Sequence, residues 1–198
     1  MSVRRVVKLA VLAVCVLLVA PLIVAAWLEK AVARTEGVFL TLGQLLALAP
    51  GPIGVYLRAA YCYGTLEQCS LEVHVGFGSV FTHRGARLAR NVSMGLYCVV
   101  GHATIGEGTR LASRVSVPSG KRQHLDDSGA MSDENRFERV TIAAGCWIGE
   151  GAIVLADVGE RCIVSAGTVV IKPVVAGCVV GGNPARVLKG PDGASPAT

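Results

Sequence analysis

The sequence predicts an all-β domain, a parallel β-helix, that follows membrane-associated helices at the N-terminus. Three observations indicate this. Aliphatic residues recur every six positions through the C-terminal two-thirds, a small residue stands two places before nearly all of them, and the N-terminal quarter contains long uncharged stretches. Neither an α-helix nor an ordinary strand has a period of six. A β-helix does, because each six-residue repeat forms one flat side of a coil.

The bulk composition agrees with a repeat domain attached to apolar segments. A length of 198 residues suits one globular domain with additional segments. The mean hydropathy of +0.54 is high for a purely soluble protein, and much of the excess lies before residue 58. The net charge of +5, without a long basic run and with few aromatic residues, gives little support to nucleic-acid binding.

Residues 1–57 are predicted to form a membrane anchor. Leu9 to Leu28 is a stretch of twenty residues without a charge, enough to span a bilayer as a helix. A second uncharged stretch, Gly37 to Leu57, contains Pro50-Gly51-Pro52 and is either a second crossing or a broken, re-entrant or interfacial segment. By the positive-inside rule, the basic residues before the first stretch place the N-terminus in the cytoplasm: Arg4, Arg5 and Lys8.

Two crossings or a re-entrant hairpin return the main domain to the cytoplasmic side of the inner membrane, which is the location we expect. A single crossing places it outside. A signal peptide cleaved near Ala31-Val32-Ala33 is an alternative, but the first apolar stretch is longer than the apolar core of a usual signal peptide and a second one follows. Residues 58–70 are expected to be a short amphipathic connector to the repeat domain.

The repeat domain is predicted over residues 71–189, with a flexible tail at 190–198. Three sides make a triangular coil of roughly 18 residues, and about five coils follow from Leu71 to Gly182. The interior of such a prism is narrow, so only aliphatic and small side chains fit. Seven cysteines are scattered without metal-type spacing. Cys98, Cys146 and Cys162 occupy the small inward position, which predicts a packing role for them.

The repeat stops once, over residues 118–139, and this interruption carries the best catalytic candidate. A structureless stretch of 22 residues is long for a compact domain, and such loops are usually functional or disordered. His124 lies in it, and histidine is suited to general base catalysis because its pKa lies near the working pH. His83 and His102 are expected to be corner or rim residues of the prism.

Residues 140–188 read VTIAAGCWIGEGAIVLADVGERCIVSAGTVVIKPVVAGCVVGGNPARVL. Through its WIGEGA, SAGTVV and GGNPARV elements, this block resembles the hexapeptide-repeat acyltransferases, and within them the maltose/galactoside-type acetyltransferases and the O-acetyltransferases of surface-polysaccharide synthesis. The resemblance implies a left-handed β-helix and a homotrimer with active sites between neighbouring prisms. It also implies acetyl-CoA as co-substrate and no metal.

The family's motifs assign roles to several residues of this chain. A histidine at a similar spacing before the WIG tryptophan is the family's general base, and His124 stands 23 residues before Trp147. Asp126 and Asp127 are candidates to orient its imidazole, with a solvated acidic loop as the alternative. The motif match places these residues on coenzyme A, the last two on its nucleotide phosphates: Glu150, Ala166, Ile171, Lys172, Arg186 and Lys189.

These features predict a membrane-anchored O-acetyltransferase that acts by direct transfer. The expected acceptor is a hydroxyl of a sugar or of a lipid-linked or polymeric saccharide. Galactoside-type members contact the acceptor through an asparagine that residues 92–98 (VSMGLYC) lack, so a small non-sugar acceptor remains an alternative. A non-catalytic β-helix scaffold of a membrane complex is another. A zinc site of the carbonic anhydrase type needs a His-x4-His pair, which the sequence does not contain.

Overall fold

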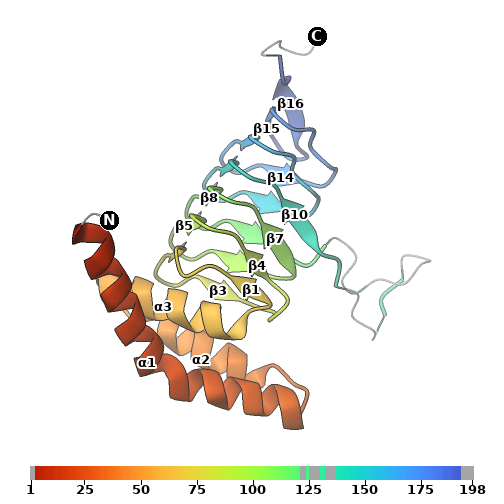
Figure 1. Cartoon of the computed structure of the whole chain (residues 1–198). Coiled ribbons are helices and arrows are strands. Elements are labelled where there is room, and N and C mark those ends of the chain that lie inside the picture. Colours follow the sequence, from red (N-terminus) through yellow and green to blue (C-terminus); the bar gives the residue numbers. More distant parts are fainter. Residues whose placement is uncertain (1–2, 121–123, 125–129, 133–136, 193–198) are drawn as a thin grey trace.

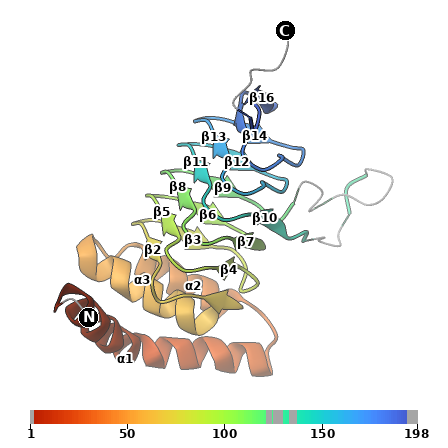
Figure 2. The ribbon, with the colours of Figure 1, turned by 45° about the horizontal axis from the view of Figure 1, so that its top comes forward.

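Three helices cover one end of a three-sided parallel β-helix, and the C-terminus lies at the other end (Figure 1). The structure is a computed structural model, and it describes residues 3–120, 124, 130–132 and 137–192. The helices are α1 (Val3–Val32), α2 (Gly37–Ala47) and α3 (Gly51–Thr65). Helices α2 and α3 pack on the first coil, and α1 crosses beneath them, mainly against α3 (Figures 1 and 2).

Helix α1 packs closely on α3 through a glycine. A Cβ added to Gly64 would lie 2.5 Å from Cδ1 of Ile23, so any larger residue would separate the two helices. The indole N–H of Trp27 donates to the Gly64 carbonyl at 2.7 Å. The segment Ala10–Val32 of α1 contains an 18-residue stretch with a mean hydropathy of 2.9 and has the length and composition to cross a membrane.

The second apolar stretch is divided into two helices near Pro50-Gly51-Pro52. Helix α2 ends at Ala47 and α3 begins at Gly51. The expected connector over residues 58–70 is helical up to Thr65, where α3 ends. Tyr61 is buried, and its hydroxyl donates to the Phe39 carbonyl at 2.9 Å. This half of α3 therefore caps the first coil of the prism.

The prism has three sheets, A, B and C, each following one side. Sheet A contains β1 (Gln68–Cys69), β4 (Arg87–Leu88), β7 (Ala103–Ile105) and β10 (Val140–Ile142). Sheet B contains β2 (His74–Val75), β5 (Ser93–Met94), β8 (Arg110–Leu111), β11 (Trp147–Ile148), β13 (Ile163–Val164), β15 (Val179–Gly181) and β16 (Arg186–Lys189). Sheet C contains β3 (Val80–Phe81), β6 (Val99–Val100), β9 (Ser116–Val117), β12 (Ile153–Val154) and β14 (Val169–Val170). Only β16 is antiparallel to its described neighbour, β15.

The six-residue pattern becomes stacked ladders of inward side chains. On sheet B, Met94 pairs with Leu111, Leu111 with Ile148, and all three are buried. Cys98, Cys146 and Cys162 are also buried, which confirms their packing role, and burial raises the pKa of each thiol. The prism has about six turns where the sequence predicts roughly five. Two features account for the difference. The first coil already begins at β1, before Leu71, and in the upper coils the side that follows sheet A is formed by isolated bridges at Val158 and Val174.

Candidate active site

The interruption of the repeat leaves and re-enters the prism at the corner between sheets C and A, which we call the C–A corner. It leaves after β9 and returns at β10 (Figure 2). The backbone N–H of Glu138 donates to the Ser119 carbonyl at 3.0 Å, and the buried Ser119 hydroxyl accepts the His102 N–H at 2.8 Å. Gly120 has φ +83°, and a Cβ there would lie 2.7 Å from Cβ of Glu138. Ser119, Gly120 and Glu138 thus form a closed neck.

The exit from the loop is fixed to the coils below it. Arg139 donates through Nη1 to the Gly85 carbonyl at 2.8 Å and through Nη2 to Oε2 of Glu67 at 2.6 Å. Its Nη2 is also 2.7 Å from Nε2 of His102. Two residues before Arg139, the Phe137 ring lies 4.2 Å, centroid to centroid, from the imidazole of His83. Both corner histidines therefore hold the returning strand.

The electrostatics of these contacts favour a neutral His102. Because Arg139 donates to Nε2, this nitrogen must accept and the imidazole proton resides on Nδ1. Burial, followed by the charge of Arg139, lowers the pKa of His102. Hydrogen bonds from Arg87 and Arg139 lower the pKa of Glu67 to about 2. The exit is thus a neutral imidazole beside an ionised Arg–Glu pair.

His124, the predicted general base, is exposed on the loop. Its carbonyl accepts the Ser132 N–H at 2.9 Å. An exposed imidazole on a loop with a fixed neck is open to an approaching substrate. Asp126 and Asp127, the predicted orienting residues, lie outside the described residues.

The predicted coenzyme A residues divide into two groups. Glu150 and Ala166 stack on successive coils at the corner between sheets B and C, the B–C corner, where the Gly167 N–H donates to the Glu150 carbonyl at 2.8 Å. Ile171 and Lys172 lie at the C–A corner, above the neck of the loop. The structure therefore does not bring all these residues together on one prism.

The remaining two residues of the set lie on the last strand. Arg186 and Lys189 are exposed on β16, where Arg186 pairs with Gly181 and Lys189 with Val179 of β15. Because β16 is antiparallel to β15, Arg186 lies at the end of sheet B that leads to the B–C corner, and Lys189 lies at its opposite end.

The outer faces of the three sheets differ in polarity. Sheet A presents polar side chains, Gln68, Arg87, Thr104 and Thr141. Sheet B presents His74, Ser93 and Arg110 on its lower coils and Trp147 and Ile163, 47% and 46% exposed, on its upper coils. Sheet C presents Val99 and Ile153. The upper coils of sheet B and the face of sheet C are thus suited to contact with another protein surface.

Solved structures of known proteins share this architecture. No family model and no curated protein sequence matches the chain. A maltose O-acetyltransferase from Clostridium difficile 630 superposes with a TM-score of 0.65 at 21% identity, covering 76% of this chain and 83% of the other. The chain has the fold of the hexapeptide-repeat acetyltransferases. A member from Vibrio cholerae has a TM-score of 0.61 at 19% identity, with 77% and 89% covered. A galactoside acetyltransferase in complex with coenzyme A has the same TM-score at 18% identity, with 77% and 80% covered.

The sequence analysis did not identify the residues that hold the loop: Ser119, Phe137 and Arg139. Part of the signal was present, because His83 and His102 each stand two places after an inward residue of sheet C and so had to share one corner. The sequence does not mark Arg139 as their partner. Its contacts reach back 37 residues to His102 and 72 to Glu67.

Proposed function

We propose that the chain is a membrane-anchored O-acetyltransferase. It transfers an acetyl group from acetyl-CoA to a hydroxyl of a sugar or of a lipid-linked or polymeric saccharide. One observation carries the proposal: an exposed histidine, His124, lies on a loop with a closed neck that projects from a prism of the acetyltransferase fold. Solved proteins of this fold are named for acetylation of maltose and galactosides, which supports a saccharide acceptor.

The reaction proceeds in one displacement. The His124 imidazole accepts the proton of the acceptor hydroxyl, and the oxygen attacks the thioester carbonyl. The new C–O bond forms, the C–S bond breaks, and the coenzyme A thiolate leaves with the proton that His124 returns. A backbone N–H stabilises the oxyanion of the tetrahedral intermediate. All seven cysteines are buried, which argues against a cysteine acyl-enzyme.

Coenzyme A is held along the upper coils. Arg186 and Lys189 supply exposed cations for its nucleotide phosphates. Backbone groups at the stacked turns of Glu150 and Ala166 face the pantetheine arm, and Ile171 with Lys172 closes the site. The isoleucine takes the place of a hydroxyl-bearing residue, so one polar contact to the cofactor is absent.

The functional unit is a homotrimer. The base and Lys172 lie at the C–A corner, whereas Glu150 and Ala166 lie at the B–C corner, with sheet C between them. A neighbouring copy that places its B–C corner beside the C–A corner of the first completes the site. The exposed apolar side chains of sheet C and of the upper coils of sheet B support burial of these surfaces between copies.

The anchor attaches the enzyme to the cytoplasmic face of the inner membrane, where acetyl-CoA is available. The outer side of α1 exposes large apolar residues, including Leu17, Leu18 and Val32. With 11 residues, α2 is about 16 Å long, half the thickness of a bilayer core of about 30 Å. This length favours the re-entrant or interfacial arrangement over two crossings. Protease protection of the repeat domain in inside-out vesicles would contradict this location.

Substitution of the base tests the proposed activity. With acetyl-CoA and a panel of saccharides, His124→Ala is expected to lower kcat by about 10²–10⁴, measured as release of the coenzyme A thiol. Calorimetry should show unchanged affinity for coenzyme A. The matched control is Ser132→Ala, which keeps the backbone hydrogen bond to the His124 carbonyl and should retain activity. Full activity of His124→Ala would refute the assignment of the base, and failure of the native chain to bind coenzyme A would favour the scaffold.

A further inference from the structure

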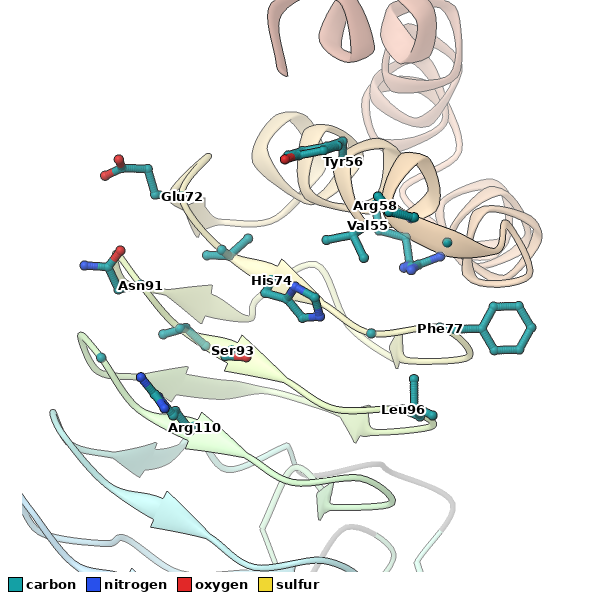
Figure 3. A pocket seen from close by; sticks show the side chains of 16 residues that line it. Val55, Tyr56, Arg58, Glu72, His74, Phe77, Asn91, Ser93, Leu96 and Arg110 are labelled. Atoms are coloured by element: carbon teal, nitrogen blue, oxygen red, sulfur yellow. The ribbon is translucent and has the colours of Figure 1, made fainter. Parts of the chain in front are cut away.

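A large cavity lies away from the residues assigned to acetyl transfer. It has a volume of about 960 Å³ and separates the first half of α3 from the outer face of sheet B. Helix α3 contributes Val55 and Arg58, which point toward His74 on β2 (Figure 3). Ser93 on β5 and Arg110 on β8 continue the wall along the next two coils (Figure 3).

The wall of this cavity contains a buried cation. Arg58 is only 3% exposed. Its Nε donates to the Val75 carbonyl at 2.8 Å, and its Nη1 donates to the Ala49 carbonyl at 2.7 Å. Its Nη2 is buried and has no hydrogen-bond partner among the described residues. The Nη2 atom is enclosed by protein, so Arg58 contributes its positive charge to the wall of the cavity and not a free donor.

The charges around the cavity favour an anion. Arg110 is a second cation on the wall. The carboxylate on the rim, Glu72, lies 3.3 Å from Nε of Arg90, so its charge is compensated. Helix α3 begins at Gly51 on the rim without a side-chain cap, so the positive end of its dipole adds to the two guanidinium groups. Guanidinium groups and a helix N-terminus together are suited to a phosphate.

The surface beside the cavity is apolar. Val55, Pro52 and Leu96 line the cavity with hydrocarbon. Around the turn between α2 and α3, next to Pro52, three large apolar side chains are exposed by more than half: Leu45, Leu48 and Ile53. An anionic cavity ligand that also has an apolar part would cover this surface.

We propose that the cavity between α3 and sheet B binds the phosphate group of a lipid-like amphiphile, whose apolar part lies on the turn between α2 and α3. The site recognises one phosphate together with adjoining hydrocarbon. It is separate from the residues assigned to acetyl transfer, and its occupancy can be measured without acetyl-CoA.

Calorimetry on the full-length protein in a non-ionic detergent tests this site. Dihexanoyl phosphatidic acid is expected to bind, with dihexanoyl phosphatidylcholine and inorganic phosphate each binding more weakly. Arg110→Gln, which changes an exposed residue, should weaken phosphatidic acid binding about tenfold. Val55→Trp keeps both charges, fills the cavity and should abolish binding. The control Arg114→Gln, at an exposed arginine outside the cavity, should bind as the native chain does.

Several results would overturn the proposal. If Arg110→Gln bound phosphatidic acid as tightly as the native chain, the contact assigned between Arg110 and the phosphate would be refuted. If phosphatidylcholine bound as tightly as phosphatidic acid, the site would not select an anion. If inorganic phosphate bound as tightly as phosphatidic acid, the hydrocarbon would make no contribution to binding. His124→Ala is expected to bind phosphatidic acid normally, so failure of the proposed transferase activity and failure of this site are distinguishable.

Discussion

A single buried ion pair joins the helices to the prism at the residue scale. Glu29 of α1 and Arg84 of the first coil are both buried, with Nη2 of Arg84 2.7 Å from Oε2 of Glu29. The same carboxylate accepts the backbone N–H groups of Val38 and Phe39 at 2.8 and 3.1 Å. It therefore caps the start of α2, where the N-cap residue Glu36 makes no capping hydrogen bond. These bonds offset the desolvation of two buried charges.

Removing one partner of this pair should be costly. Arg84→Met leaves the Glu29 carboxylate buried without its cation, and we expect a loss of about 3 kcal/mol in the free energy of unfolding. Denaturant unfolding of the full-length protein in detergent measures it. The control is Arg90→Met, whose partners Glu72 and Glu107 lie at the surface and whose loss should cost at most about 1 kcal/mol. Equal losses in the two variants would contradict the structural role given to Glu29 and Arg84.

At the scale of elements, the neck of the loop determines how the loop is attached to the prism. Ser119 and Glu138 close it, while His102 and Arg139 tie its exit to the second coil. These contacts fix the two ends of the loop to the prism. The position of His124 thus depends on residues of the first two coils as well as on the loop itself.

The neck should be sensitive to pH through His102. Its pKa is lowered in the folded state from about 6.5, so the neutral form stabilises the fold above that pH, and this contribution is lost as the pH falls below it. A protonated His102 would also face Arg139. The thermal unfolding midpoint should fall between pH 7.5 and 5.5 by more in the native chain than in His102→Gln. An identical fall in the two proteins would refute this role. Glu67, with a pKa of about 2, titrates below this range.

The coils were predictable from the sequence because each six-residue unit carries its own inward residue and corner. The roles of the helices were less predictable. An uncharged stretch such as Gly37 to Leu57 has the same composition whether it faces lipid or covers a prism, and Arg58 gave no sign that it would be buried. The choice of His124 as candidate base rests on the interruption of the repeat and on the family's spacing before Trp147, and its role stays a prediction. The contacts that hold the exit of its loop, from Arg139 to Glu67 and from Phe137 to His83, join residues far apart in the chain, and local patterns do not encode such pairs.

At the scale of the whole molecule, the two groups of site residues predict that activity requires neighbouring copies. His124→Ala and Ala166→Trp should each be inactive, since the first lacks the base and the second blocks the B–C corner. Coexpressed in equal amounts, they should form mixed trimers in which about a quarter of the junctions pair an intact base with an intact corner. Transferase activity of the purified mixture measures the recovery. Mixed trimers without any recovery would place the whole site within one copy.

The helical layer has a consequence for solubility. Helices α2 and α3 cover β1, β2 and β3, and the Gly78 N–H of the first coil donates to the Ala47 carbonyl at the end of α2. A chain that began at Gln68 would expose the unpaired amides and carbonyls of its lowest coil, a template on which other prisms can add. Such chains would polymerise end to end. The two helices that cover the first coil, α2 and α3, therefore also protect the chain against fibre growth.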